Sequence, residues 1–327
     1  MGRYNKILSE LHVLSQETDR SIASLIIDFF NCRFVHGASW DNFRVLGMYN
    51  MSNEERKKVY TFKRQKRISD YLNKNATEED LNILMDKNKF NVAFSKFIKR
   101  DWYDSTNLNK SRFDDFLCRN EKFLLKPILS SQGKGIELLY TSELDSDAFF
   151  KDVSSKKVIL ESFIKQHPAL ASVNPSSVNT VRLITARFGD DVHVVCGGGL
   201  RCGSKNAFVD NFHNGGCAYP INVETGVVDG PGLALGSKAM VSMHPSTGKE
   251  MPGFNIPNWD KVLNMVRSAA LVMKNVGYIG WDIAILEDGC EIIEANVNYP
   301  GTNIIQLDGF QAYDKIREFL RECKLQM

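Results

Sequence analysis

The spacing of hydrophobic residues divides the chain near residue 120. Before that point, apolar residues recur every three or four positions, as on one face of a helix, for example over residues 22–30 and 54–72. Thr77 is followed by three acidic residues and predicts an N-cap, and the helix that it opens continues to Met85. We therefore expect residues 1–120 to be mostly helical.

After residue 120 the pattern is typical of strands, because short runs of β-branched and aromatic residues alternate with turns rich in Gly, Asn and Asp. The predicted strands cover residues 123–129, 136–140, 158–161, 181–188, 192–199, 278–286 and 291–297. Residues 260–276 predict an amphipathic helix instead. A few helices among such strands favour an α+β fold with a largely antiparallel sheet and a domain boundary near residue 120.

Composition limits the classes of protein to which the chain can belong. With 327 residues, of which 43% are hydrophobic and 24% charged, it suits a globular protein with two lobes or domains. A formal net charge of +2 gives no overall field for binding nucleic acid. No apolar run is long enough for a membrane helix and the first residues are too polar for a signal peptide, so we expect a cytoplasmic protein.

Two further features of composition carry an expectation. The seven cysteines are odd in number and show no CxxC spacing, so we expect reduced thiols and neither a zinc site nor a disulfide framework. Seven basic residues lie between positions 56 and 67. A solvated helix face accounts for them, and a weak contact with anionic lipid or a phosphorylated partner is the alternative.

A glycine-rich turn joins the first two predicted strands. Lys126 lies in the first strand, and the turn contains Ser130, Ser131, Gly133, Lys134 and Gly135. The glycines leave backbone N–H groups that can point at an anion, and Lys134 adds a positive charge. A plain hairpin turn is the alternative, since Gly is the usual turn residue. Lys126 favours a binding loop, because a lysine in an apolar strand needs a partner for its charge.

The last two predicted strands carry acidic and amide side chains. Glu294 and Asn296 are two positions apart and so share one face of their strand. A three-residue loop before Cys290 would place Asp282 directly opposite Glu294. A two-residue loop would place Asp282 opposite Ala295 instead.

On the first of these registers, two carboxylates and an amide oxygen converge on one patch. The like charges repel each other, and a hard cation such as Mg²⁺ would relieve the repulsion because it takes oxygen ligands. The alternative is that Asp282 and Glu294 pair with Lys or Arg. Arg182, at the start of another apolar strand, is likewise either one half of a salt bridge or a contact to a phosphate or carboxylate.

The order and spacing of these motifs resemble the ATP-grasp fold, and within it the sugar-transfer-associated ATP-grasp group found with polysaccharide biosynthesis. The resemblance covers roughly residues 85–310 and includes the stretches 126–136, 161–164, 179–182, 209–212, 215–216, 280–282 and 294–296. It implies a nucleotide held between two α+β lobes with mostly antiparallel sheets. We therefore expect a helical N-terminal region over 1–85 and an ATP-grasp domain over 86–327, with lobes at about 120–165 and 175–327.

The resemblance also implies roles for single residues. In the lobe with the glycine-rich loop, Lys126 would contact the ATP phosphates, the loop with Ser130, Ser131, Gly133, Lys134 and Gly135 would close over them, and the backbone of Glu161, Ser162, Phe163 and Ile164 would read adenine. In the other lobe, Asp282, Glu294 and Asn296 would hold Mg²⁺. Arg182 and Lys134 would lie near the transferred phosphoryl group, and Asn303 would serve the acceptor.

Enzymes of this fold mostly join a carboxylate to an amine through an acyl phosphate, with ADP and phosphate as products. The resemblance therefore implies such a ligase, joining an amino acid to a sugar-linked carboxylate or amine in capsule, exopolysaccharide or O-antigen synthesis. One alternative is a small-molecule kinase, in which Asp210 would be the general base. Another is a nucleotide-binding regulatory protein without turnover, against which the complete set of site residues argues.

Overall fold

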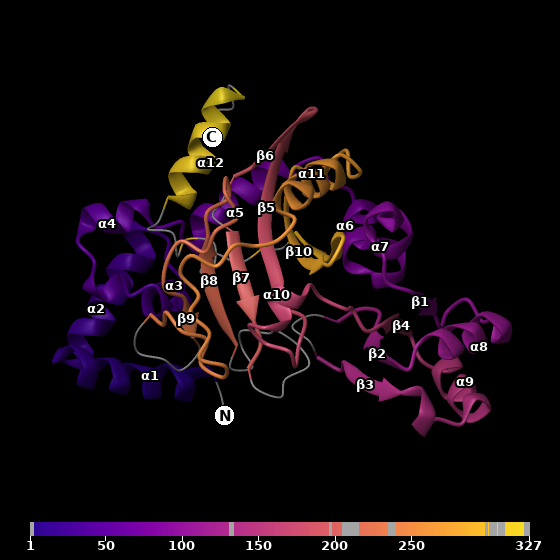
Figure 1. Cartoon of the computed structure of the whole chain (residues 1–327). Coiled ribbons are helices and arrows are strands. Elements are labelled where there is room, and N and C mark those ends of the chain that lie inside the picture. The colour runs from indigo at the N-terminus through magenta and orange to yellow at the C-terminus, as the bar shows by residue number, and fades with distance from the viewer. Residues whose placement is uncertain are drawn as a thin grey trace.

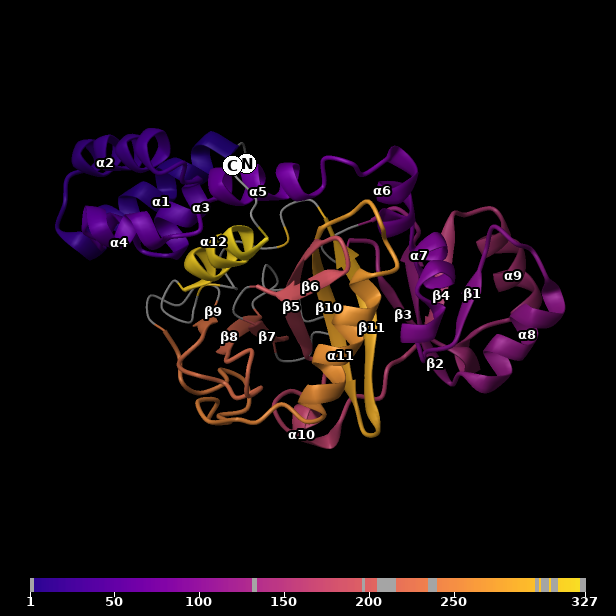
Figure 2. The same ribbon diagram turned by 90° about the horizontal axis from the view of Figure 1, so that it is seen from above.

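The computed structural model describes residues 3–130, 134–195, 198–204, 216–234, 240–297, 300, 306 and 311–323. Its elements form three parts in a row, shown in Figures 1 and 2: the helices α1–α4, a large antiparallel sheet, and a small antiparallel sheet with α8 and α9. No helix in the described part of the chain has both the length and the apolar composition needed to span a membrane.

The first part of the chain is helical, as its periodicity predicts. The helices are α1 (Arg3–Thr18), α2 (Ile22–Val35), α3 (Trp40–Val45), α4 (Asn53–Lys58), α5 (Phe62–Leu72), α6 (Glu78–Met85) and α7 (Lys87–Ala93), with the short 3₁₀ turns Met48–Asn50 and Ser95–Phe97. Helices α1, α2 and α3 share one core that includes Leu14, Leu25 and Phe43. The predicted cap of α6 is confirmed, because Thr77 and Asp80 form a capping box.

The helix predicted over 54–72 is in fact two helices. The chain leaves the helical conformation at Val59, and Thr61 begins α5 as its N-cap. Val59 and Tyr60 are both fully buried, but Val59 belongs to the core of the N-terminal helices and Tyr60 to a core on the large sheet. The break lets two adjacent side chains enter two different cores, which a continuous helix would not allow.

The break between α4 and α5 divides the basic residues of the run at 56–67 between two helices. Arg56 is buried and pairs with Asp28 at 2.8 Å. The Arg64 guanidinium donates to backbone carbonyls at the end of α4 and lies over the ring of Tyr313. Lys57 and Lys66 pair with acidic residues on their own helices. Lys57 and Lys66 are exposed and fit the predicted solvated face, whereas the buried Arg56 does not.

The small sheet has the strand order β1-β4-β2-β3 with every pair antiparallel. Its strands are β1 (Trp102–Asp104), β2 (Lys122–Pro127), β3 (Glu137–Tyr140) and β4 (Val158–Ser162), and its helices are α8 (Lys110–Arg119) and α9 (Ser146–Ser154), with a 3₁₀ turn at Thr141–Glu143. Helices α8 and α9 pack on one face around Phe113, Phe123 and Val153. The sequence predicts three of these strands, and β1 is too short to give a pattern.

The large sheet has the order β11-β10-β5-β7-β8-β9, with β6 paired to the far end of β5. Its strands are β5 (Thr180–Phe188), β6 (Asp191–Val194), β7 (Gly198–Cys202), β8 (Cys217–Ile221), β9 (Leu233–Ala234), β10 (Tyr278–Leu286) and β11 (Gly289–Asn296), and the remaining helices are α10 (Pro168–Ala171), α11 (Trp259–Ala270) and α12 (Ala312–Glu322). The run predicted over 192–199 is divided between β6 and β7. The sequence does not predict β8, where Pro220 argues against an interior strand.

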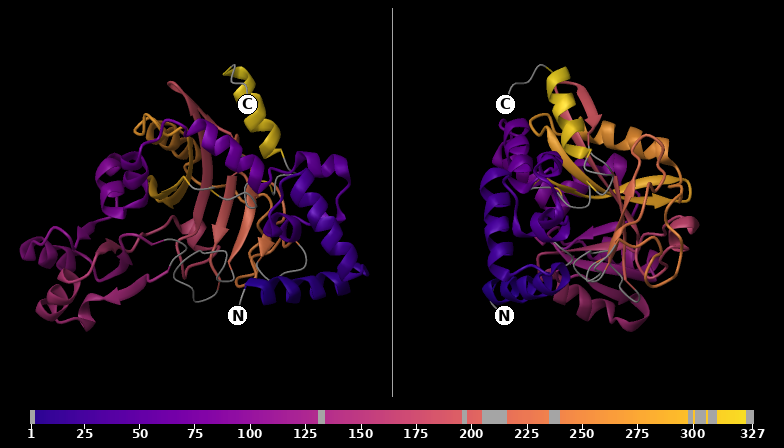
Figure 3. Two further views of the ribbon diagram at one scale, coloured as in Figure 1. Left: turned by 180° about the vertical axis from the view of Figure 1, so that it is seen from behind. Right: turned by 90° about the vertical axis from the view of Figure 1, so that its left-hand side faces the viewer.

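Alternation along β5 separates the two faces of the large sheet. Val181 and Leu183 point into the main core, which α6, α7 and α11 cover. Ile184 and Ala186 point the other way, into a core shared with α5 and with α12, drawn in yellow in Figure 3. Alternation along the strand directs Arg182 to this second face as well, but Arg182 lies beyond the apolar residues. The second face is therefore apolar at one end and charged at the other.

The β10–β11 hairpin confirms the predicted pairing of Asp282 with Glu294 but by another route. The turn is a two-residue one, with Leu286 opposite Gly289. That turn alone would put the two carboxylates out of register. A β-bulge between Asp282 and Ile283 adds one residue to β11 and brings Asp282 opposite Glu294.

Candidate functional site

Three charged residues form a row across three neighbouring strands at one side of the large sheet. Arg182 on β5 lies directly opposite Asp282 on β10, and Asp282 lies directly opposite Glu294 on β11. All three are on the face whose other end is covered by α5 and α12. The antiparallel register thus gathers residues that are far apart in the sequence.

Asp282 is held by two arginines. Arg182 grips it in a bidentate manner, with Nε to Oδ1 at 2.5 Å and Nη2 to Oδ2 at 2.8 Å, and Arg201 Nη1 donates to Oδ2 at 2.9 Å. Burial would raise the pKa of Asp282, but the two guanidinium groups, Arg182 first, hold that pKa well below its usual range. The salt-bridge alternative therefore describes Asp282 in this structure, and a cation at Asp282 would share it with Arg182 and Arg201.

Glu294 has the opposite electrostatic character. Burial, and then the neighbouring Asp282 carboxylate, raise the pKa of Glu294 to about 7. Two residues along β11, the Nδ2 atom of Asn296 is buried with no hydrogen-bond partner among the described residues. A divalent cation would stabilise the Glu294 carboxylate, because it supplies the missing positive charge, and the side-chain oxygen of Asn296 offers a second oxygen ligand on the same face of β11. Glu294 and Asn296 therefore fit a Mg²⁺ site.

The small sheet contributes a buried ion pair. Lys126 Nζ lies 2.5 Å from Glu161 Oε2, and the other oxygen of Glu161 accepts from Arg100 at 3.1 Å and from Asn91 at 3.0 Å. Burial opposes ionisation of Glu161, but Arg100 and then Lys126 lower its pKa far below the usual range. The lysine that the sequence predicts to need a partner thus has one, and its ammonium is fixed on the sheet.

Lys87 is a residue of this site that sequence reasoning missed. It is the first residue of α7, and its ammonium donates to the carbonyls of Pro127 and Ser130 at 3.1 and 2.8 Å. Burial lowers the pKa of Lys87, and the largest opposing influence comes from Glu294. In the sequence, a lysine next to an N-cap Asp looks like an ordinary surface residue. Only the fold shows that it lies between the glycine-rich loop and the acidic strand.

Arg100 connects the two sheets. Its guanidinium pairs with Glu161 of the small sheet, and it also pairs with Glu291 and donates to the Ile292 carbonyl of β11 at 2.8 Å. The side chain is almost fully buried. Arg100 therefore holds the lysine-bearing strands close to the strand that carries Glu294 and Asn296.

The profile of the family described as sugar-transfer associated ATP-grasp matches residues 66–317. The chain belongs to this family. Its small and large antiparallel sheets are accordingly the two lobes of an ATP-grasp fold preceded by helices, as the sequence predicts. No curated protein matches the sequence.

Several solved structures resemble this ATP-grasp chain at low identity. The ATP-grasp ligase PsnB, in complex with a precursor variant, Mg and ADP, is 12% identical with a TM-score of 0.43, covering 79% of this chain and 69% of PsnB. A carboxyaminoimidazole ribonucleotide synthase from Aspergillus clavatus with ATP is 10% identical with a TM-score of 0.43, covering 68% and 47%. D-alanine–D-alanine ligase from Bacillus anthracis with ATP is 13% identical with a TM-score of 0.43, covering 74% and 66%. This chain spans less than half of the synthase.

The segment predicted to bind adenine, residues 161–164, lies partly within β4 and partly after it. Glu161 and Ser162 lie within the strand, and Ser162 donates its backbone N–H to the carbonyl of Asp101 at 2.8 Å. Phe163 and Ile164 follow the strand, and Lys122 Nζ lies 4.1 Å from the centre of the Phe163 ring. Recognition of adenine by this segment stays a prediction, and Phe163 and Ile164 are its best-placed residues.

The glycine-rich loop is described only at its two ends. Ser130 accepts a hydrogen bond from Lys87 through Oγ at 3.2 Å. Lys134 is exposed, and Gly135 has a positive φ of 71°, a conformation that favours glycine. Ser131 and Gly133 lie outside the described residues, as do Asn303 and Asp210.

Arg182 also fixes the chain that follows β11. Its Nη1 donates to the carbonyl of Pro300 at 2.8 Å. With the two bonds to Asp282, this contact uses three of the five guanidinium N–H donors. The predicted catalytic arginine is therefore a rigid side chain on the face that carries Glu294.

Proposed function

We propose that the chain is an ATP-dependent ligase that activates a carboxylate as an acyl phosphate and joins it to an amine, releasing ADP and phosphate. Membership of the ATP-grasp family supports this proposal at the level of fold and nucleotide. The observation that carries it is the position of Lys87, whose ammonium donates to the carbonyls at the end of the lysine-bearing strand β2 and is influenced electrostatically by Glu294 of β11. Such a charge arrangement suits a nucleoside triphosphate with its divalent cation.

Each group would have a stated task. Lys87 and Lys126 would neutralise phosphate oxygens, and their fixed positions would avoid the cost of reorganising charge during reaction. Glu294 and Asn296 would hold Mg²⁺, which supplies positive charge to the phosphates when bound. Arg182 would stabilise the transferred phosphoryl group with its remaining donors. The loop over residues 130–135 would exclude water, which would otherwise hydrolyse the acyl phosphate.

The chemistry requires no side-chain nucleophile. An oxygen of the substrate carboxylate attacks the γ-phosphorus, and the bond to the bridging oxygen of ADP breaks. The amine then attacks the acyl carbon, and phosphate leaves with that former carboxylate oxygen. The absence of a Ser/His/Asp arrangement from the sequence motifs agrees with this route.

We further propose substrates from the chemistry of polysaccharide assembly, because the family description refers to sugar transfer. The carboxylate or amine would be sugar-linked, such as a uronic acid or an amino sugar, and the second substrate an amino acid. Residues 86–327 would form the catalytic domain of a cytoplasmic enzyme, and residues 1–85 an accessory helical region.

The test is a panel of sugar-linked and amino-acid carboxylates and amines, incubated with the chain and Mg·ATP and scored for ADP and free phosphate. For an active pair, ¹⁸O in the carboxylate must appear in the released phosphate. With both carboxylate oxygens labelled, one ¹⁸O leaves in phosphate and the other stays in the amide. Released phosphate without label would contradict the acyl phosphate, and a phosphorylated acceptor without free phosphate would favour the kinase alternative.

Two lysines of the same helix supply a matched pair of variants. Lys87→Met removes an ammonium from the site, whereas Lys89→Met removes one that pairs with Glu79 at the surface. We expect the first variant to lose at least about 100-fold in turnover, in line with removal of a charge-stabilising donor, and the second to match wild type. Equal turnover in the two variants would remove Lys87 from the mechanism.

A further inference from the structure

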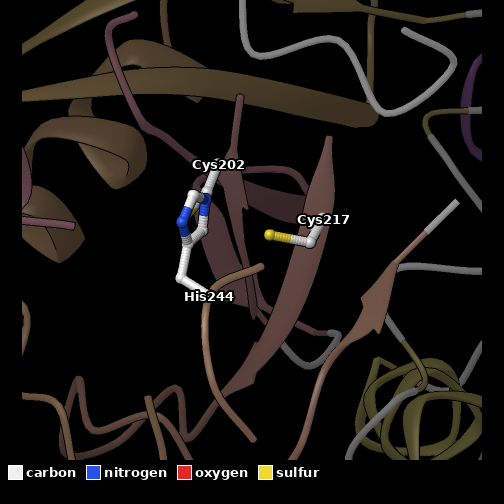
Figure 4. A group of neighbouring side chains, drawn as sticks. All are labelled: Cys202, Cys217 and His244. Carbon is white, nitrogen blue, oxygen red and sulfur yellow. The ribbon is translucent and has the colours of Figure 1, made fainter. Parts of the chain in front are cut away.

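A second cluster of reactive side chains lies on the other face of the large sheet. Cys202 ends β7, Cys217 begins β8, and the two are directly opposite each other. His244, from the segment that follows β9, lies beside them. One ligand atom from each residue lies within 4.8 Å of the other two, and all three side chains are buried. Figure 4 shows Cys217 Sγ pointing toward the imidazole ring of His244.

This cluster is separate from the proposed nucleotide site. Cys202 and Cys217 belong to the main core, with Val181 and Leu183. Arg201, the neighbour of Cys202 in the chain, points to the opposite face and reaches Asp282. The properties of this cluster therefore do not depend on ligase activity.

The hydrogen bonds of His244 determine its tautomer. Thr247 donates its only hydroxyl proton to the carbonyl of Val173 at 2.8 Å. His244 Nδ1, 3.1 Å from the same Thr247 oxygen, must therefore be the donor in that contact. In a neutral ring the lone pair is then on Nε2, which lies 3.1 Å from the carbonyl oxygen of Gly203. Two acceptors would then face each other, and either a proton on Nε2 or a bound metal ion removes this conflict.

The remaining groups around the cluster are also rich in lone pairs. The Cys217 sulfur interacts with both Cys202 and His244. Two residues along β8, the buried hydroxyl of Tyr219 lies close enough to the Cys217 sulfur to interact with it. Sulfur, imidazole nitrogen and oxygen atoms thus converge in the core, and this is a combination of donor atoms that soft metal ions bind.

We propose that Cys202, Cys217 and His244 bind a transition-metal ion, for which Zn²⁺ is the best match. Two thiolates and one imidazole are an established zinc ligand set, and the fourth position is open to a water or a nearby oxygen. The bond from Nδ1 to Thr247 is the outer contact that orients a metal-binding histidine. Mg²⁺ and Ca²⁺ are excluded, because hard cations prefer oxygen ligands.

The geometry is close to what zinc requires. A tetrahedral site with Zn–S near 2.3 Å and Zn–N near 2.0 Å holds its ligand atoms roughly 3.5–4 Å apart, so small side-chain movements suffice. The ion would join the ends of β7 and β8 to the segment around His244. Sequence reasoning excluded a zinc site because no short Cys spacing is present, and here the strand pairing supplies the proximity.

The experiment measures bound metal in the full chain. The protein is produced with Zn²⁺ supplied, freed of loose metal by gel filtration, and analysed by mass spectrometry for elements. We expect about one zinc per chain, and Co²⁺ added to metal-free protein should give the visible bands and thiolate charge-transfer absorption of a tetrahedral cobalt–sulfur site. Cys217→Ser should lose the metal and the charge-transfer absorption.

Two variants serve as controls. Cys118→Ser removes an exposed cysteine and Cys290→Ser a buried one, and both should bind metal as wild type does. Three results would overturn the proposal: no zinc and no cobalt spectrum in folded wild-type protein, wild-type metal content in Cys217→Ser, or a Cys202–Cys217 disulfide in freshly purified protein. The cobalt spectrum of the wild-type protein tests the proposed metal site even where a variant fails to fold.

Discussion

At the scale of single residues, the proposed site depends on two neighbouring carboxylates in opposite states. Asp282 is ionised because Arg182 and Arg201 hold it, whereas burial and Asp282 itself make ionisation of Glu294 costly. The pKa of Glu294, near 7, lies above its ordinary value of 4.5. Between these two values the native state binds more protons than the unfolded chain, so the free energy of unfolding falls as pH rises through this range.

Glu294→Gln should remove that part of the pH dependence. We compare the urea concentration at the unfolding midpoint of the two proteins in the absence of divalent cations. As the pH rises from 4.5 to above 7, the midpoint of wild type should decrease relative to that of the variant. Mg²⁺ should reduce the fall in wild type, because it stabilises the carboxylate, and leave the variant unaffected. Parallel midpoint curves for the two metal-free proteins would contradict the raised pKa.

How far the sequence predicts this site can be judged residue by residue. The need of Lys126 for a partner follows from its apolar strand. The opposition of Asp282 and Glu294 was predicted from a three-residue loop, whereas a two-residue turn and a bulge produce it. The identity of the partners does not follow, because Glu161, Arg201 and Lys87 approach from other strands and a helix. Their approach depends on strand order and lobe packing, which periodicity does not encode.

At the scale of elements, local signals predict the structure where they act alone. The Thr77 cap begins α6 as expected, and the long strands β5, β10 and β11 lie where their apolar runs indicate. The predicted helix over 54–72 was wrong, because two adjacent side chains enter two different cores and the helix breaks between α4 and α5. The predictions also missed the bulge in β11, because a bulge is a property of strand pairing and has no pattern of its own in one strand.

The cap of α6 gives a prediction at this scale. Thr77→Ala removes the side-chain oxygen that accepts from the backbone N–H of Asp80, and should lower the free energy of unfolding by about 1 kcal/mol. Thr77→Ser should restore it, since serine caps at least as well. Urea unfolding measures both. A loss in Thr77→Ser as large as in Thr77→Ala would show that the methyl group, and not the cap, matters.

At the scale of the whole molecule, one buried arginine joins the two lobes. Arg100 pairs with Glu161 in the small sheet and with Glu291 in the large one. Truncating it leaves two buried carboxylates without their shared cation. The lobes would then lose the contact that holds Lys126 near the acidic strand.

Arg100→Met should therefore cost about 3–5 kcal/mol of unfolding free energy, the range expected when one partner of a buried ion pair is removed. Arg119→Met removes an exposed arginine that pairs with Asp101 at 2.9 Å, and should cost less than about 1 kcal/mol. Denaturant unfolding of both variants at one pH makes the comparison. Similar costs for the two arginines would contradict a structural role for Arg100 between the lobes.

The central claim is a nucleotide site between Lys87 and Lys126 on one side and Glu294 and Asn296 on the other. The most direct measurement is the melting temperature with and without Mg·ATP, for wild type and for the double variant Glu294→Gln, Asn296→Ala. A ligand that binds only the native state raises the melting temperature by mass action. We expect a Mg²⁺-dependent rise in wild type that the double variant loses. No rise in folded wild-type protein, or an equal rise in the double variant, would contradict it.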